Sequence, residues 1–350
     1  MKELRVGVIG TGFGRLVQIP VFAAHPRARV VAVAGATPGK AARVAAEFGI
    51  PHAFDDWRDL IRVDLDLVSI TPQPVHHRTM ALAAAGAGRH ILCEKPMALH
   101  AREAEEMLTE ASRAGVVHVI DHELRFNPNR RKIKVLIDEG FIGRPRHVLI
   151  TIVGSGRSDP TRPWTWWSDA GQGGGLLGAQ GSHQIDLLRY WLGDVEAVTG
   201  TVESFIQERP ADGGRRRVTS DDFATFALRF RSGAVAAVLL SVVAAHPEGP
   251  RIEVWGEDGS LRLDGHERLW GAGRGEEWKE LTEPETVTAP PGMDYSALWG
   301  LSFVRLADHL VTSVLDGAPL APAATFADGV AVHRVMDAVR RLRRNTVLAR

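Results

Sequence analysis

Three short segments in the first hundred residues carry groups that could do chemistry together. Gly10-Thr11-Gly12-Phe13-Gly14, Thr71-Pro72-Gln73 and Glu94-Lys95-Pro96 each follow a short apolar run. Such runs are typical of buried parallel strands, and open parallel sheets bind ligands at the carboxyl ends of their strands. A lysine there suits general acid and base work on a hydroxyl or carbonyl group. Pro96 restricts Lys95 to extended geometry, and a cis bond between them would fix the segment further.

The glycine-rich segment indicates a turn that binds a dinucleotide. Gly10 suits the tight turn, and Gly12 lets a pyrophosphate approach the backbone at the start of a helix, where free N–H groups favour an anion. The usual third glycine would be residue 15, which is Arg15, so the match is partial. Its position after the first strand still favours nucleotide binding over a purely structural turn. The residues expected to contact the cofactor here are Gly10, Thr11, Gly12, Phe13 and Gly14.

The end of the second strand bears on the choice of cofactor. An acidic residue there would bind the ribose 2′-hydroxyl of NAD, but residues 34–40 contain no carboxylate. Thr37 could donate to a 2′-phosphate and Lys40 could neutralise it, so NADP is favoured over NAD, unless Lys40 is simply solvated. Thr71, Pro72 and Gln73 could contact the nicotinamide half. His76 could belong to the site or merely start a helix.

The elements that must position these residues alternate between strand and helix. Strand patterns span residues 4–9, 29–34, 65–71, 90–94 and 116–121, and helix patterns lie near 14–24, 38–48, 74–86 and 100–114. Continuous apolar strands separated by helices predict a doubly wound parallel sheet of the Rossmann type.

After residue 125 the pattern changes to long strands that lie close together. We expect strands over 146–153, 196–205, 222–230, 234–243, 251–256 and 260–264, and helices over 127–140, 183–192, 296–316 and 326–343. The loops 155–175 and 206–220 are expected to be surface excursions. The chain is therefore predicted to be α/β, with a dinucleotide-binding domain over 1–122 and an α+β domain over 123–350. The second domain, with a mostly antiparallel open sheet, would bind substrate and mediate oligomerisation.

The composition excludes several classes of protein. Among 350 residues, 42 Lys and Arg balance 42 Asp and Glu, so no net charge draws the chain to nucleic acid or an anionic membrane. No apolar run is long enough to cross a bilayer, and no signal-peptide pattern opens the chain. Cys93 is the single cysteine, so no intrachain disulfide is possible. A cytoplasmic protein is expected, and no residue cluster predicts a metal.

The order of these motifs resembles the Gfo/Idh/MocA oxidoreductase family. Gly10-x-Gly12, Thr71-Pro72-Gln73-x-x-His76 and Glu94-Lys95-Pro96 match its first domain. Two later segments, from Gly173 to Asp186 and Phe326-Ala327-Asp328-Gly329, resemble its second, so the resemblance covers essentially the whole chain. It implies NAD(P)-dependent oxidation of a secondary alcohol, or the reverse reduction, on a sugar, keto-sugar, inositol or related polyol. It also implies a homodimer or homotetramer.

The resemblance further implies which residues meet at the reacting carbon. Lys95 matches the family lysine and His183 the family histidine, so both are expected to be catalytic. The aspartate that usually stands four residues before the histidine is Ala179 here, which puts the usual proton relay in doubt. Asp186 could share a helix face with His183 and contact substrate, or act structurally. Glu94 could orient Lys95 or hydrogen-bond to the cofactor.

Other candidates lie outside these motifs. His122 follows the last parallel strand and could contact cofactor or substrate, whereas Arg125 is expected to be structural. In Arg162-Pro163-Trp164-Thr165-Trp166-Trp167, Arg162 could bind an anion and Trp166 could stack on a sugar, or the segment could pack over the core or a subunit interface. Two alternative functions stay open: eliminative or hydrolytic chemistry on glycosides with tightly held NAD, and a non-catalytic NADP-binding sensor or regulatory subunit.

Overall fold

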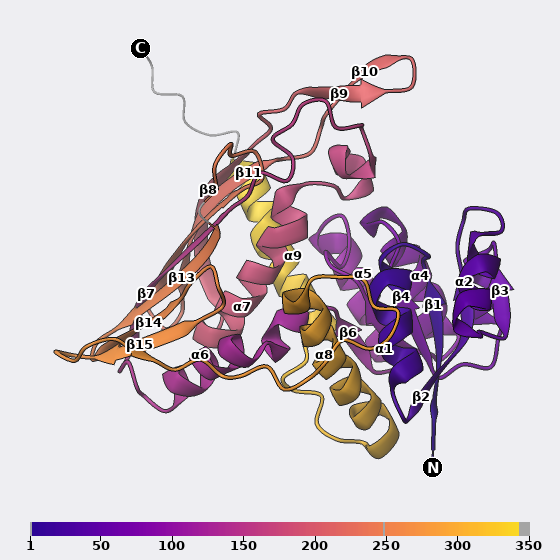
Figure 1. Ribbon diagram of the computed structural model, residues 1–350, viewed down its shortest axis with the longest axis horizontal. Helices are drawn as coiled ribbons and strands as arrows, with labels where there is room; N and C mark the ends of the chain where they lie inside the picture. The colour runs from indigo at the N-terminus through magenta and orange to yellow at the C-terminus, as the bar shows by residue number, and fades with distance from the viewer. Residues whose placement is uncertain (1, 248, 343–350) are drawn as a thin grey trace. The chain divides into compact units, whose positions relative to one another are not determined.

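The computed structural model describes residues 2–247 and 249–342 and divides into two compact units (Figure 1). Unit 1 is built from residues up to Asn127 together with residues 286–331, and unit 2 from residues 128–285 together with those from 332 on. The predicted domain boundary after residue 122 stays a prediction, because a division into compact units does not show where one function ends and another begins.

Unit 1 is built on a six-stranded parallel sheet of order β3-β2-β1-β4-β5-β6. Its strands are β1 (Leu4–Ile9), β2 (Ala28–Ala34), β3 (His52–Phe54), β4 (Leu67–Ile70), β5 (His90–Cys93) and β6 (His118–Ile120). The order reverses between β1 and β4, and open parallel sheets bind ligands at the carboxyl ends of the strands where the order reverses. The predicted doubly wound sheet is confirmed. The short strand β3 had no apolar pattern and was not predicted.

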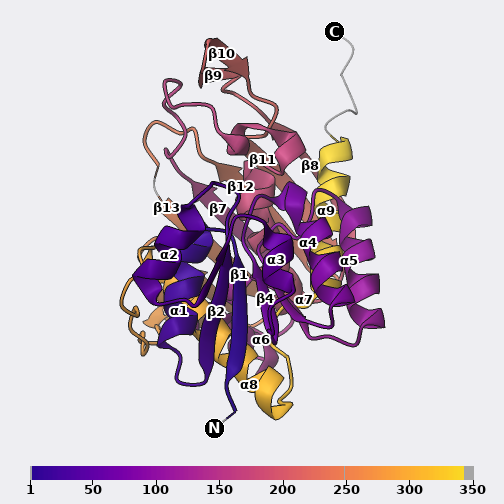
Figure 2. The ribbon, with the colours of Figure 1, turned by 90° about the vertical axis from the view of Figure 1, so that its right-hand side faces the viewer.

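Helices cover both faces of this sheet, as Figure 2 shows. The connections contain the π-helical turn η1 (Gly14–Gln18), α1 (Ile19–Ala24), α2 (Lys40–Phe48), α3 (Trp57–Ile61), α4 (Pro74–Gly86) and α5 (Ala101–Arg113). The 3-10 turn η2 (Glu123–Phe126) follows β6. The five-residue α3 is too short for a helical period to show in the sequence, and it too was not predicted.

A late helix, α8 (Ala297–Asp316), completes the core of unit 1. Phe303, Leu306 and Leu310 belong to the same buried cluster as Leu4 and Phe22. The rings of Phe22 and Phe303 meet edge to face, 5.9 Å apart and at 90°, which is a favoured aromatic geometry. Segments that are far apart in the sequence therefore contribute to one hydrophobic core.

Unit 2 is built on an eight-stranded sheet of order β16-β15-β14-β13-β7-β12-β11-β8. Its strands are β7 (Pro145–Val153), β8 (Val195–Glu203), β11 (Phe223–Phe230), β12 (Val235–Ser241), β13 (Gly249–Gly256), β14 (Gly259–Leu263), β15 (Leu269–Gly273) and β16 (Lys279–Glu280). All neighbours are antiparallel except β7 and β12. The mostly antiparallel sheet is confirmed. The helices α6 (Pro128–Asp138) and α7 (Ser182–Leu192) lie along one face (Figure 1), and α9 (Phe326–Leu342) ends the described chain.

The segment 206–220 is a hairpin rather than a plain loop. β9 (Glu208–Ala211) and β10 (Gly214–Arg217) pair antiparallel as a separate two-stranded sheet. Arg, Glu and Pro fill these strands, so backbone pairing forms them without an apolar pattern that the sequence could show.

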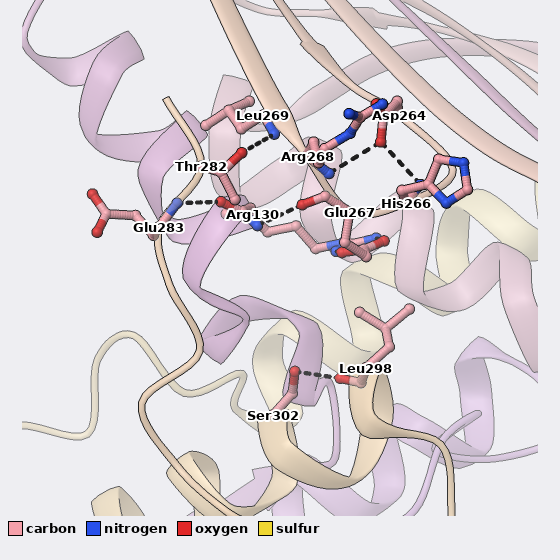
Figure 3. Close-up of polar contacts among 11 residues, drawn as sticks. Arg130, Asp264, His266, Glu267, Arg268, Leu269, Thr282, Glu283, Leu298 and Ser302 are labelled. Carbon is pink, nitrogen blue, oxygen red and sulfur yellow. Dashed lines mark hydrogen bonds and ion pairs between the residues drawn. The ribbon is translucent and has the colours of Figure 1, made fainter. Parts of the chain in front are cut away.

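Contacts from α6 hold the turn between β14 and β15 (Figure 3). Glu267 has φ +60, the one positive φ among the non-glycine residues that the structure describes. Its carboxylate makes a two-point ion pair with the buried Arg130, and its carbonyl oxygen accepts a 2.7 Å hydrogen bond from Asn129 Nδ2. A non-glycine residue in this region costs roughly 1–3 kcal/mol, so these contacts offset local strain.

Candidate active site

The turn after β1 has the shape that a pyrophosphate needs. Gly10 has φ +117, and a Cβ on it would overlap the side chain of Thr71 and crowd the main chain of Pro72. That position therefore requires glycine. A Cβ on Gly12 would meet no heavy atom of the described chain within 4 Å. The backbone of Gly12 is thus open at the start of a helical turn, where an anion is favoured. The residues present fit a dinucleotide.

Gly14, rather than residue 15, allows the close packing of helix on strand that the third glycine of such a turn usually provides. A Cβ on Gly14 would lie 2.9 Å from Thr71 Oγ1 and 3.0 Å from Val8 Cγ1, which is tighter than side chains normally tolerate. The helical turn can therefore approach the sheet only with glycine here. Arg15 points toward α2 instead, where its Nε donates to Glu47 Oε2 over 3.2 Å.

Thr11 and Phe13, the other two predicted residues of the turn, contact neighbouring segments of unit 1. The side chain of Thr11 packs on Gly35, where a Cβ would lie 2.7 Å from Thr11 Cγ2. Phe13 meets Tyr295 edge to face, with ring centroids 5.2 Å apart. Tyr295 precedes α8 and was not predicted as part of the site.

Both signs of charge lie at the turn after β2. Gly39, with φ +72, starts α2, and its N–H donates to Asp55 Oδ1 over 3.2 Å. The next residue, Lys40, donates its N–H to the Thr37 carbonyl over 3.1 Å. Asp55 follows the unpredicted strand β3, so the sequence offered no sign that a carboxylate would lie beside Lys40.

His77 joins the loops that follow β4 and β5. It is fully buried, with Nε2 3.0 Å from the Pro72 carbonyl oxygen and Nδ1 3.1 Å from that of Pro96. Burial lowers the pKa of His77 to about 4, so the ring is neutral and one of its nitrogens donates. The Lys95–Pro96 bond is cis. His76 is exposed in the first turn of α4, where its N–H donates to the Gln73 carbonyl.

A glutamine links the ends of three strands. Gln18 Nε2 donates to Glu94 Oε1 over 2.8 Å and to Asp121 Oδ2 over 3.1 Å, and Ser69 Oγ donates to Gln18 Oε1. All four residues are buried. Gln18, Ser69 and Asp121 were missed as site residues. The available signal was a glutamine in an otherwise apolar helical segment and an aspartate directly after a buried strand.

Burial and mutual repulsion raise the pKa values of the three carboxyl groups beside Lys95, which belong to Glu94, Asp121 and Glu123. Burial raises the pKa of Glu94, and burial together with the Glu94 charge raises that of Asp121 well above its ordinary value. Burial also raises the pKa of Glu123 to about 8, although the Lys95 ammonium acts in the opposite direction. Lys95 Nζ lies 5.9 Å from the centroid of the Trp299 ring.

The segment that follows β6 starts with Asp121 of this cluster and continues into His122. His122 is buried, and its N–H donates to the Ile120 carbonyl over 2.7 Å. Arg125 makes structural contacts, as expected: its guanidinium donates to the Pro322 carbonyl over 3.2 Å and pairs with Asp328 at 3.2 Å.

Unit 2 contains the predicted histidine and aspartate. His183 and Asp186 are both buried, three residues apart on α7, and Ala179 lies in the preceding π-helical turn η5 (Leu177–Gly181). The Asp221 carboxylate accepts a 2.6 Å hydrogen bond from the Leu177 N–H and so fixes the start of this turn.

The tryptophan-rich loop of unit 2 is partly used for packing. Trp164 and Trp167 each lie against a guanidinium, that of Arg216 at 3.5 Å and that of Arg157 at 3.7 Å from the ring centroid. Trp166 remains 37% exposed. The neighbouring Arg162 donates to the Gly156 carbonyl.

No group of three or more His, Cys, Asp or Glu side chains within 2–247 and 249–342 could hold a metal ion. In the same ranges, no helix combines the length and apolar character that a membrane span needs.

Comparison with known proteins agrees with this geometry. Residues 4–122 match the model of an oxidoreductase family with an NAD-binding Rossmann fold, and residues 130–262 match that of the GFO/IDH/MocA C-terminal domain. An uncharacterized oxidoreductase of Synechocystis sp. is 30% identical over 324 residues, covering 89% of this chain and 87% of the relative. Levoglucosan dehydrogenase of Pseudarthrobacter phenanthrenivorans is 29% identical over 377 residues, covering 97% and 96%.

A solved structure shows the same architecture. Levoglucosan dehydrogenase in complex with NADH and L-sorbose superimposes with a TM-score of 0.90 at 28% identity, covering 98% of this chain and 97% of the other. The parallel sheet and the mixed sheet thus have counterparts in a structure that contains NADH.

Proposed function

Because this chain belongs to the Gfo/Idh/MocA family of NAD-binding oxidoreductases, we propose that it transfers a hydride between a nicotinamide cofactor and a secondary alcohol or ketone of a sugar or related polyol. The observation that carries the proposal is the position of Lys95. It follows β5, and β5 is separated from the glycine turn of β1 by β4 alone. The glycine turn, which would bind the cofactor, and the Lys95 amine, which would transfer the proton, therefore both follow the carboxyl ends of strands in the same sheet.

When bound, the nicotinamide ring supplies the hydride chemistry. The open backbone of Gly12 would hold the pyrophosphate, and Thr71, Pro72, Gln73 and His122 would line the nicotinamide half. The Lys95 amine would accept the hydroxyl proton during oxidation and return it during reduction. His183 of unit 2 would assist Lys95, as the family resemblance implies.

The relatives support a carbohydrate substrate. One is named for levoglucosan, and a solved structure contains L-sorbose. In this chain, Arg162, Trp166 and Asp186 are the proposed substrate contacts of unit 2. An exposed ring such as that of Trp166 suits the apolar face of a sugar.

We propose NAD as the working cofactor and NADP as the alternative. The Asp55 carboxylate accepts the Gly39 N–H at the turn where a 2′-phosphate would approach, and like charges repel there. The related structure contains NADH. The adjacent Lys40 favours NADP instead. Dissociation constants measured for both cofactors decide between them, and tighter binding of NADP would overturn the argument from Asp55.

Replacement of Lys95 tests the function. Lys95→Ala should lower kcat roughly 100- to 10,000-fold on whichever member of a polyol and keto-sugar panel the unmutated protein turns over. The dissociation constant for NADH should change little, because the glycine turn is intact. Lys2→Ala, an exposed lysine of the same unit, is the control. NADH binding without any turnover by the unmutated protein would favour the alternative, a non-catalytic sensor or regulatory subunit.

A homodimer or homotetramer is proposed as well. The sheet of unit 2 would supply the contact surface, and light scattering on the purified protein would give the mass in solution.

A further inference from the structure

Three carboxyl groups, those of Glu94, Asp121 and Glu123, are buried beside Lys95. Their exposed fractions are 7%, 1% and 3%. Exposed acidic side chains would simply be solvated. Buried ones must be neutralised by a cation or by a proton, because an uncompensated buried charge is very unfavourable. A single lysine ammonium cannot balance three carboxylates, so the cluster holds protons.

Gln18 shows where two of these carboxyl groups meet. Its Oε1 accepts a hydrogen bond from Ser69, so its Nε2 is the atom directed at the carboxyl groups; the reverse orientation would direct an amide oxygen at them. One amide nitrogen carries two hydrogens, and here they go to Glu94 over 2.8 Å and to Asp121 over 3.1 Å. Ionising both of two carboxyl groups held by one nitrogen is unfavourable in a buried site, because the two charges repel each other.

Asp121 is the member best placed to keep the proton. Its Oδ1 meets no N–H or O–H donor among the described residues, while its carboxyl lies within hydrogen-bond reach of those of Glu94 and Glu123. Two acceptors can bond to each other only through a shared proton. A protonated Asp121 satisfies this arrangement and the raised pKa values that burial causes at Asp121 and Glu123 agree with it.

We infer that Asp121 and Glu123 are positioning residues that form a proton-holding relay for Lys95. The relay takes up the proton that Lys95 removes from the substrate hydroxyl and returns it in the reverse reaction. The inference rests on the proposed function and deepens it. It also accounts for Ala179, whose methyl side chain cannot take part in proton transfer: the carboxyl groups come from the nucleotide-binding unit instead.

The proposed transfer balances atoms and charges. During oxidation the substrate loses a hydride from carbon to the nicotinamide cofactor and a proton from its hydroxyl oxygen to the Lys95 amine. Above a pH of about 8, where Glu123 is ionised, the resulting ammonium passes a proton to the Glu123 carboxylate, directly or through one water molecule. An ammonium–carboxylate pair thereby becomes a neutral amine–acid pair, so the second step leaves the net buried charge unchanged. Asp121, protonated throughout, holds Glu123 and Glu94 in place.

Few other titratable groups act on the relay. Cys93, directly before Glu94, is buried, and burial together with the charges of Glu94 and Asp121 raises the pKa of its thiol. Tyr295, before α8, has its pKa raised by burial and by the three carboxylates. Lys95 is the cation that interacts with all three. A pH profile that changes with Glu123 or Asp121 has to be compared with the contributions of these groups.

The test begins with the protein free of cofactor. Infrared absorption of protonated carboxyl groups should be present near neutral pH in the unmutated protein and weaker in Asp121→Asn, which keeps the side-chain shape. Glu277→Gln, an exposed glutamate of unit 2, should leave the band unchanged. Since this measurement also works on the unmutated protein across a pH series, it does not depend on any variant folding.

The second measurement is the pH profile of turnover on a sugar from the panel. Glu123→Gln should lower kcat roughly 10- to 100-fold with little change in KM, and added small carboxylate buffers should restore part of it. A merely structural role would predict neither the rescue nor the altered profile. An active protein without the carboxyl band, or a Glu123→Gln profile equal to that of Glu277→Gln, would overturn the relay alone. Absence of turnover by the unmutated protein would overturn the proposed function and the relay with it.

Discussion

The open backbone at Gly12 predicts that one added methyl group weakens nucleotide binding without weakening the fold. The φ angle of Gly12 is not positive, and a Cβ on this residue would meet no heavy atom of the described chain within 4 Å. Gly12→Ala should therefore leave the free energy of unfolding unchanged or raise it by up to about 1 kcal/mol, because the unfolded chain loses conformational freedom.

The effect on binding should be much larger. A methyl group on Gly12 would hold a phosphate oxygen away from the backbone N–H groups at the start of η1. Loss of one hydrogen bond to a charged group is worth roughly 1.5–3 kcal/mol, which corresponds to a rise of about 10- to 150-fold in the dissociation constant.

Titration of NADH fluorescence and denaturant unfolding measure the two effects separately. Gly86→Ala is the matched control, since a Cβ at the end of α4 is also clear of other atoms within 4 Å and lies away from the glycine turn. It should leave NADH binding unchanged. Gly10→Ala provides the opposite pattern, because its φ of +117 and the overlap with Thr71 should destabilise the fold by roughly 1–3 kcal/mol.

An unchanged dissociation constant in Gly12→Ala would refute the reasoning. It would mean that the dinucleotide does not approach this backbone, and the assignment of the glycine turn would fall with it.

Two further predictions concern stability. Glu123 has a pKa of about 8 in the folded protein against an ordinary value of 4.5, so between these pH values the unfolded chain loses a proton that the folded chain keeps. Stability from this group therefore falls as the pH rises, by at most about 1.4 kcal/mol per pH unit. Unfolding at several pH values should show a steeper fall than in Glu123→Gln, in which Glu94 and Asp121 still contribute in the same direction. His77 acts in the opposite direction between about pH 4 and 6.5, so the comparison must be between the two proteins; equal slopes would contradict the prediction. Glu267→Ala should lower the free energy of unfolding by roughly 3 kcal/mol or more, because it removes the carboxylate that pairs with the buried Arg130 guanidinium. Glu267→Gly should lower it by less, since glycine accepts φ +60; the reverse order in denaturant titrations would contradict this account.

The sheet of unit 1 was predictable because its longer strands are continuous apolar runs. β1 was predicted with its observed bounds, Leu4–Ile9, and the predicted carboxyl ends of β2, β4, β5 and β6 lie within one residue of the observed ones. β3 and α3 were not found, because three and five residues are too few for a period to appear. The hairpin β9–β10 forms through backbone pairing of polar residues, which leaves no pattern in hydrophobicity.

The site was predictable only where its chemistry is local. The glycine turn and Lys95 belong to short motifs whose geometry depends on adjacent residues. Gln18, Ser69 and Asp121 lie far apart in the sequence and meet because η1, β4 and β6 end at one edge of the sheet. The spacing of these residues in the sequence does not predict that they come into contact, since the contact depends on the order of the strands in the sheet.

The position of α8 has a consequence for how the protein is made. A ribosome completes the glycine turn, Lys95 and all six strands of the first sheet long before it reaches Phe303, Leu306 and Leu310. Until those residues emerge, the apolar surface around Leu4 and Phe22 lacks its natural cover. The hydrophobic core of the nascent nucleotide-binding unit therefore cannot be completed before α8 has been synthesised.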